Sequence, residues 1–136
     1  MPEPRSRQSI LDQVFQNERG VDVLDSLAVM SASDLDELPF GAIRLDRNGR
    51  VLSFNQTESQ YSGLSAESVI GKSFFTDVAP CTNVQRFAGS FYEGVARRKL
   101  HVVFPFHFQF KTKPRDVTVT LYYHQPTDTI WVLVRG

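Results

Sequence analysis

The chain has 136 residues, which is enough for one domain with a single hydrophobic core and too short for a second domain. Its composition, 41% hydrophobic and 22% charged, is ordinary for a soluble globular protein. Fifteen basic and fifteen acidic residues give a formal net charge of zero, so electrostatics argue against nucleic acid or an anionic membrane as a partner.

The N-terminal region carries two short apolar groups at helical spacing. They are Ile10, Leu11, Val14 and Phe15, and then Val21, Val23, Leu24 and Leu27. Neither group suits a signal peptide or a membrane span, and we therefore expect a cytoplasmic location. The segment 31–38 predicts a short capped helix that ends before Pro39. We expect residues 1–38 to form a helical cap on a core domain, 39–136, and to be the least stable part of the fold.

Strand patterns begin after this cap. Alternating apolar residues predict strands over 40–46 and 51–54, with a hairpin turn between them that has Asn48-Gly49 at its centre. The stretch 55–81 mixes short helical pieces with loops.

Two helices are marked more clearly than the others. Ser65 and Gly71 are the start and stop signals of a short helix. The stretch 87–99 predicts one long helix, because apolar residues recur on one face. That helix ends in a short basic run, which we interpret as a solvated face.

Three strands are predicted at the C-terminal end, over 103–111, 116–123 and 129–134. In the first of them the even positions are aromatic and predicted to face inward, namely Phe104, Phe106, Phe108 and Phe110. Two strands, small helices, a connecting helix and three more strands form an α+β order. It fits a five-stranded antiparallel sheet with helices on one face.

The histidines show no spacing typical of metal ligands, and we predict no metal site. His101 opens a strand, His107 alternates outward, and His124 ends a strand beside a turn. We interpret all three as surface or edge residues.

Cys81 is the single cysteine, which excludes internal disulfides and cysteine-rich zinc sites. A lone cysteine is most often a small buried hydrophobe. Its surroundings favour a second interpretation. The segment 69–82 reads Val-Ile-Gly-Lys-Ser-Phe-Phe-Thr-Asp-Val-Ala-Pro-Cys-Thr and resembles the chromophore-attachment segment of the photoactive yellow proteins, a branch of the PAS fold. The resemblance continues without a gap from Leu38 to Val132.

This resemblance implies a blue-light photoreceptor. In the family, 4-hydroxycinnamic acid (p-coumaric acid) is joined to the cysteine as a thioester and is delivered as an activated coenzyme A thioester. Cys81 would be the attachment point, since acylation needs a thiolate-capable sulfur. Glu58 matches the buried, protonated glutamate that hydrogen-bonds the phenolate and passes it a proton after light isomerises the double bond. A buried carboxylate left without a partner would strain the fold and rearrange the N-terminal cap.

The resemblance also assigns the wall of the chromophore pocket, namely Phe74, Val78, Ala79, Thr82, Phe108 and Phe110. Four positions depart from the family pattern. Phe54 replaces the tyrosine that is the second phenolate donor, and Ser62 stands where better-known members have threonine. Leu64 replaces an arginine that covers the pocket, and Thr112 replaces a methionine, from which we expect slow dark recovery.

The loss of the tyrosine donor at Phe54 removes a charge-assisted hydrogen bond of roughly 1.5–3 kcal/mol. We therefore predict a chromophore with a raised pKa and a mixture of ionised and neutral forms. Tyr61, three residues after Glu58, is one candidate replacement donor, and Ser62 or a water held by it is another. Alternatively, Tyr61 packs elsewhere with a solvated hydroxyl.

Two other classes of function compete with a photoreceptor. One is a PAS small-ligand sensor or protein-interaction module that has lost its photochemistry, for which Phe54 and Leu64 are the evidence. The other is a cysteine hydrolase, which we disfavour because no histidine lies in the pocket segments and Pro80-Cys81-Thr82 is no nucleophile elbow. We predict no enzymatic activity. The expected partner is an unidentified downstream signalling protein, and the expected state is a monomer or weak dimer.

Overall fold

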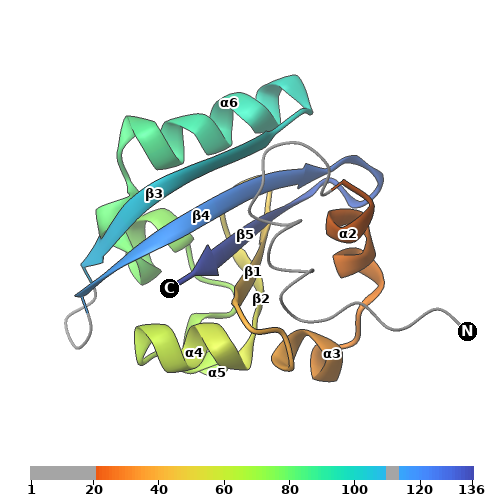
Figure 1. The fold of residues 1–136 in the computed structure, drawn as a ribbon. Coiled ribbons are helices and arrows are strands. Elements are labelled where there is room, and N and C mark those ends of the chain that lie inside the picture. The colour runs from red at the N-terminus through yellow and green to blue at the C-terminus, as the bar shows by residue number, and fades with distance from the viewer. Residues whose placement is uncertain (1–20, 110–113) are drawn as a thin grey trace, which may run out of the picture.

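The computed structural model describes residues 21–109 and 114–136 and contains a five-stranded antiparallel sheet (Figure 1). The strand order is β2-β1-β5-β4-β3. The strands are β1 (Gly41–Asp46), β2 (Val51–Phe54), β3 (His101–Gln109), β4 (Pro114–His124) and β5 (Thr129–Arg135). The helical elements are α2 (Val21–Ser26), η1 (Leu27–Val29), α3 (Ala32–Asp36), α4 (Gln56–Ser62), α5 (Ala66–Val69), η2 (Phe74–Val78), η3 (Pro80–Thr82), η4 (Gln85–Gly89), α6 (Ser90–Arg97) and η5 (Gln125–Thr127).

The five predicted strands are confirmed to within two residues at the described ends. The hairpin between β1 and β2 turns at Gly49, whose φ of 83° lies in the left-handed region that glycine adopts without strain. The amide of Gly49 donates to the carbonyl of Asp46 at 3.0 Å, and the Asp46 amide donates to Arg50 at the same distance. The inward pattern of β3 holds for Phe108, which is buried, while Phe104 and Phe106 are half-buried.

The predicted long helix is shorter than expected at both ends. Its first turn is the wide π-type turn η4, and regular α-helix runs only over α6. Arg98 closes α6 with a φ of 56°, and the Lys99 amide donates to the Gly94 carbonyl at 3.0 Å. Leu100 then packs so tightly on Gly94 that a Cβ there would lie 2.6 Å from the Leu100 Cβ. The chain thus leaves the helix before the basic run ends.

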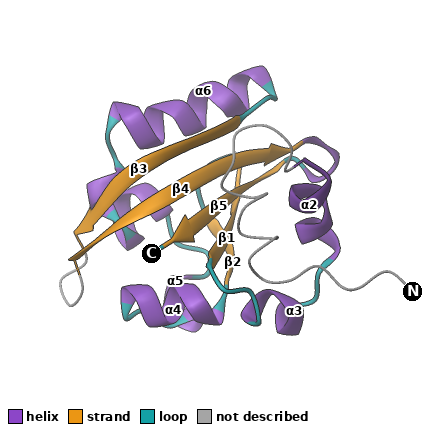
Figure 2. Cartoon of the chain, in the orientation of Figure 1, coloured by secondary structure: helices purple, strands orange, loops and turns teal. Residues whose placement is uncertain are grey.

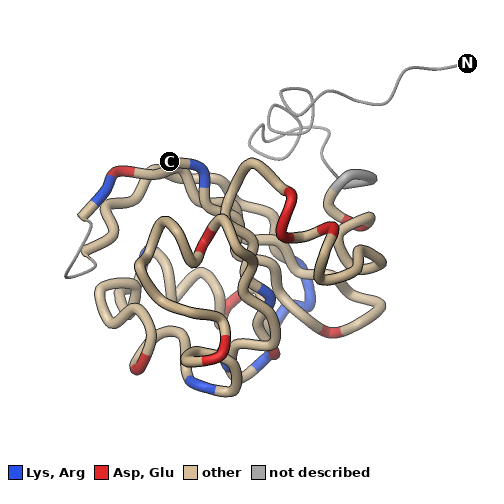
Figure 3. Tube along the Cα trace, turned by 90° about the horizontal axis from the view of Figure 1, so that it is seen from below, with Lys and Arg blue, Asp and Glu red and all other residues tan. Residues whose placement is uncertain are grey.

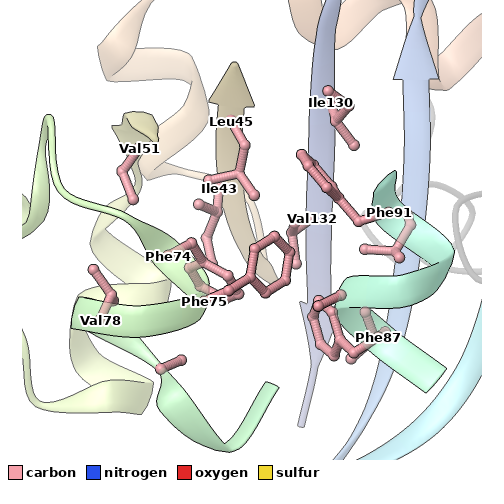
Figure 4. Close-up of a cluster of buried hydrophobic side chains, with 14 of the residues drawn as sticks. Ile43, Leu45, Val51, Phe74, Phe75, Val78, Phe87, Phe91, Ile130 and Val132 are labelled. Carbon is pink, nitrogen blue, oxygen red and sulfur yellow. The ribbon is translucent and has the colours of Figure 1, made fainter. Parts of the chain in front are cut away.

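Buried side chains form two separate clusters, one on each face of the sheet. We call the larger one the site-side cluster; it lies under α4, η2, η4 and α6, and Figure 4 shows its centre. Its labelled members are Ile43, Leu45, Val51, Phe74, Phe75, Val78, Phe87, Phe91, Ile130 and Val132. The cap-side cluster comprises Leu24, Leu27, Leu35, Leu38, Phe40, Ala42, Trp131 and Leu133.

Strand β5 divides its side chains between these two clusters. Ile130, Val132 and Val134 belong to the site-side cluster, and Trp131 and Leu133 to the cap-side cluster. Because successive side chains of a strand point to opposite faces, a continuous apolar run means that both faces are covered. Figure 2 shows helices on both sides of the strands accordingly. The helices of the core lie on one face, as predicted, and α2 and α3 cover the other.

The capped helix predicted before Pro39 is confirmed as α3. The Ser31 hydroxyl accepts from the Asp34 amide at 3.1 Å, and the Asp34 carboxylate accepts from the Ser31 amide at 3.3 Å, which is a capping box. The helix predicted around Ile10 to Phe15 lies outside the described residues. The division of the chain at residue 38 stays a prediction.

One of the three histidine predictions is wrong. His107 is exposed and pairs with Asp116 at 2.8 Å, whereas His101 is half-buried. His124 is buried, with Nδ1 at 2.7 Å from the Thr127 hydroxyl, because η5 folds back over the end of β4.

Charged residues of the described chain are scattered over the tube in Figure 3, with blue and red interspersed. No helix in the described part of the chain is both long and apolar enough to cross a membrane.

Candidate functional site

Asn55 organises the segment that carries Glu58. It lies at the N-terminus of α4 and is 3% exposed. Its side-chain oxygen accepts from the amides of Ala42 at 2.9 Å and Glu58 at 3.0 Å, and its side-chain nitrogen donates to the carbonyls of Leu35 at 2.8 Å and Phe40 at 3.1 Å. Both N–H groups and both lone pairs of the oxygen in this side-chain amide are thus used. One amide side chain joins α3, β1 and α4 and fixes the direction in which Glu58 enters the core.

The Glu58 side chain is 1% exposed, and its Oε2 has no hydrogen-bond partner among the described residues. Burial raises the pKa of this carboxyl from 4.5 to about 8, while the charge of Arg115 lowers it. A pKa of about 8 favours the protonated form of Glu58 at neutral pH, which is the form that the family resemblance implies for this residue.

Gly41 provides the space for this carboxyl. A Cβ at Gly41 would collide with Glu58 Oε2 and would lie 3.0 Å from its Cδ. Glycine at the start of β1 thus lets the Glu58 carboxyl lie directly against the strand backbone.

Cys81 lies in the single turn η3, which begins at Pro80. Its side chain is half-buried against the site-side cluster, and the Gln109 amide of β3 donates to Sγ at 3.5 Å. The next residue, Thr82, is fully buried and donates its hydroxyl to the Ala79 carbonyl at 2.7 Å. The thiol is therefore held at the boundary between core and solvent, on a turn anchored on both sides.

The residues predicted as pocket wall come together where the structure describes them. Phe74, Val78, Ala79 and Phe108 are all buried members of the site-side cluster. Phe87 ties two of them together, with ring centroids 6.0 Å from Phe74 and 6.2 Å from Phe108. Two further predicted residues, Phe110 and Thr112, lie outside the described residues.

Three of the four positions that depart from the family pattern are described by the structure, and they lie in or next to α4. Phe54, at the end of β2, is 6% exposed, and Leu64 packs against the site-side cluster from just beyond the helix. Ser62 is buried and donates its hydroxyl to the Glu58 carbonyl at 2.9 Å, so its one proton is engaged with the helix itself. The guanidinium of Arg115 lies over the Tyr61 ring, with Cζ 3.9 Å from the ring centroid.

Three residues of this site were missed in the sequence. Asn55 has a readable signal, since an asparagine before a short helical stretch is a typical N-cap. Arg115 stands at an inward position of the strand that follows Phe108, a signal that alternation alone could have supplied. Gly41 has no sequence signal, because only the tertiary structure places a carboxyl against its backbone.

Comparisons with known proteins identify this arrangement. The PAS fold family matches residues 30–135, so the chain belongs to the PAS family of sensory domains. A domain of the sensory box sensor histidine kinase/response regulator from Geobacter sulfurreducens shares the fold, with a TM-score of 0.64 at 11% identity, covering 89% of this chain and all of that one.

Within that class the similarity is more specific. The chain is 46% identical over 114 residues to the photoactive yellow protein of Halochromatium salexigens and 39% identical to that of Rhodothalassium salexigens; each alignment covers 84% of this chain and 91% of the relative. It is 40% identical to the photoactive yellow protein domain of the sensor histidine kinase Ppr from Rhodospirillum centenum, with a TM-score of 0.78, covering 82% of this chain and 97% of that domain. The chain belongs to the photoactive yellow protein family and is a PAS photoreceptor or sensor.

Proposed function

We propose that this chain is a blue-light photoreceptor that carries 4-hydroxycinnamic acid as a thioester on Cys81. When bound, that group supplies visible absorption and a double bond that light isomerises. The observation that carries the proposal is Glu58, a carboxyl inside the core whose pKa burial raises to about 8 and whose Oε2 lacks a partner among the described residues. A buried donor of this kind suits a buried phenolate.

Cys81 has the chemistry needed for attachment. Its thiolate attacks the carbonyl carbon of an activated coenzyme A thioester, forming the new sulfur–carbon bond as the bond to coenzyme A breaks. The coenzyme A thiolate leaves and takes up the proton that Cys81 has lost. The half-buried position supports this step, because the sulfur is reachable from solvent while its turn packs against the core.

Glu58 supplies the proton for signalling. In the dark it holds the proton and donates a hydrogen bond, and after illumination it gives the proton up. It then becomes a carboxylate in a site that disfavours charge, with an effective penalty of several kcal/mol. Asn55 provides a route for this strain, since it contacts the backbone of Glu58 on one side and, on the other, the carbonyl of Leu35 in the cap and that of Phe40 just after it.

Reconstitution tests the attachment. The full chain is incubated with an activated ester of p-coumaric acid, and its mass and absorption spectrum are recorded. We expect a mass increase of one acyl group and a visible band that bleaches under blue light, both of which Cys81→Ala abolishes. A colourless protein, or colour that survives in Cys81→Ala, overturns the photoreceptor and favours a PAS sensor of a small ligand that binds without a covalent bond.

A pH titration of the reconstituted protein tests the effect of Phe54. A phenol has an ordinary pKa of about 10, and the buried phenolate lacks the family's tyrosine donor. We expect two absorption bands that exchange as pH changes near neutrality, and Phe54→Tyr to move their midpoint to lower pH. A single band that is independent of pH contradicts this prediction.

We propose that the N-terminal cap is the part of the chain that rearranges in the light to signal. Hydrogen exchange of residues 24–38, compared in the dark and under continuous illumination, is expected to accelerate in the light. Glu58→Gln serves as the control, since an amide side chain cannot ionise and therefore should leave the exchange unchanged by light.

A further inference from the structure

Arg115 lies where the inward alternation of β4 begins. The buried residues Val117, Val119 and Leu121 of this strand belong to the site-side cluster, and Arg115 stands two residues before the first of them. Because the side-chain period of a strand is two, Arg115 faces the same side of the sheet. It is half-buried and is paired in the ladder with Phe108. A positive charge thus stands beside the predicted pocket wall.

Two contacts hold this guanidinium. Its Cζ lies 3.9 Å from the centroid of the Tyr61 ring, a close cation–π arrangement. Gly136 also lies against the guanidinium, so closely that a Cβ built at Gly136 would collide with it. Within residues 21–109 and 114–136, no acidic side chain forms an ion pair with Arg115. Its charge is therefore not neutralised by a described partner.

Tyr61 brings this charge close to Glu58. The two residues lie three apart on α4 and so share one face of the helix. The charge of Arg115 opposes the rise that burial imposes on the pKa of Glu58.

Other charged groups on the elements packed against α4 are engaged elsewhere. Asp36 of α3 accepts from the Gln56 amide at 2.8 Å, and Asp34 belongs to the capping box of its own helix. On β1, Arg44 donates to the Thr129 hydroxyl at 2.9 Å and Asp46 accepts from turn amides.

We propose that Arg115, held on the ring of Tyr61, is the cation that tunes the position of the proton between Glu58 and the chromophore. It takes the place of the tyrosine donor that is missing at Phe54 and of the pocket-covering arginine that is missing at Leu64. The proposal rests on the proposed function for its chromophore half. A positive charge near the site favours the ionised form of any acid there. Arg115 therefore stabilises the phenolate in the dark and the Glu58 carboxylate after illumination.

The first test needs no chromophore. In the full chain before reconstitution, the infrared C=O stretch of protonated Glu58, assigned by its loss in Glu58→Gln, is followed against pH. We expect Arg115→Gln to move the midpoint up by roughly 0.5–1 pH unit, the size expected of one partly screened charge. Arg115→Lys retains the charge, so its midpoint should lie close to that of the wild type. Arg135→Gln, which removes an exposed charge from β5, is the matched control and should change nothing.

The second test uses the reconstituted protein. Arg115→Gln is expected to raise the pH at which the two absorption bands exchange, and Arg115→Lys to restore it. Tyr61→Leu removes the ring that places the guanidinium while leaving every charge in the chain. We expect it to shift the pH of the band exchange in the same direction as Arg115→Gln, but by less. It also serves as the second variant if Arg115→Gln does not fold.

The two tests separate the two proposals. A chain that takes up no chromophore but shows the Glu58 shift overturns the proposed function and supports the role of the Arg115 charge. A chain that becomes coloured but whose midpoints are the same in Arg115→Gln, Arg115→Lys and wild type overturns the inference and leaves the photoreceptor intact.

Discussion

Two buried polar side chains that lie three residues apart differ in whether their hydrogen-bonding atoms have partners. On the boundary with the cap-side cluster, the Asn55 amide is 3% exposed and makes four hydrogen bonds. Three residues later and toward the site-side cluster, the Glu58 carboxyl is 1% exposed and has one oxygen without a described partner. A satisfied polar group fixes a unique structure, whereas an unsatisfied one stores free energy that a ligand can use. Asn55 thus contributes to stability, whereas the unpartnered oxygen of Glu58 is available to a ligand.

Asn55→Ala should give the largest loss of stability, because it leaves several buried backbone groups without partners. We expect the free energy of unfolding to fall by about 3–5 kcal/mol, measured by chemical denaturation. Asn83→Ala, at an exposed turn position, is the control and should have little effect. A loss as small as that of the control would mean that Asn55 does not join the two sides.

Glu58→Gln should stabilise the chain, and only at high pH. The unfolded carboxyl ionises at its ordinary pKa of 4.5, while the folded one keeps its proton up to about pH 8. The folded wild type therefore binds more protons in this window, so its stability falls as pH rises from 4.5 to 8. The amide does not titrate. We expect no difference between variant and wild type at pH 4 and a gain on the order of 3 kcal/mol at pH 9.

The gain from Glu58→Gln is measured by thermal unfolding across this pH range in the protein without chromophore. A difference that does not change with pH would show that Glu58 is solvated, and the contrast with Asn55 would disappear.

Gly41→Ala should destabilise the site side by about 2 kcal/mol, because the added methyl collides with the Glu58 carboxyl. The double variant Gly41→Ala with Glu58→Ala is expected to recover most of that loss, since truncation of the glutamate makes room. A double-mutant cycle on unfolding free energies measures this coupling. Purely additive effects would contradict the close packing of the two residues.

Tyr122→Phe should loosen the cap by about 1 kcal/mol. The Tyr122 hydroxyl donates to the Asp25 carboxylate of α2 at 2.5 Å, and burial together with this carboxylate raises the pKa of Tyr122. We expect faster hydrogen exchange in α2 and η1, with β5 unaffected. Tyr92→Phe removes an exposed hydroxyl that is 3.4 Å from the Asn48 carbonyl and should leave the cap unchanged. Equal acceleration across both faces would mean that the cap unfolds only with the core.

Local patterns in the sequence were sufficient for most of the fold. The alternation in β1, the Gly49 turn and the capped helix before Pro39 depend on neighbours within a few residues, and the structure confirms each of them. The resemblance around Cys81 was specific enough to indicate the family. These features are local because backbone dihedrals and side-chain period decide them.

Only the tertiary structure decided how distant segments meet. It buried His124 beneath η5, placed the Glu58 carboxyl against the backbone of Gly41, and brought Arg115 of β4 onto Tyr61 of α4. None of these contacts follows from spacing along the chain. The first depends on how η5 folds back over the end of β4, and the other two depend on how α4 lies against the sheet. The sequence by itself indicated the family and pointed to Glu58 as the candidate acid. The packing decided that Arg115 lies on the ring of Tyr61, on the helix that carries Glu58.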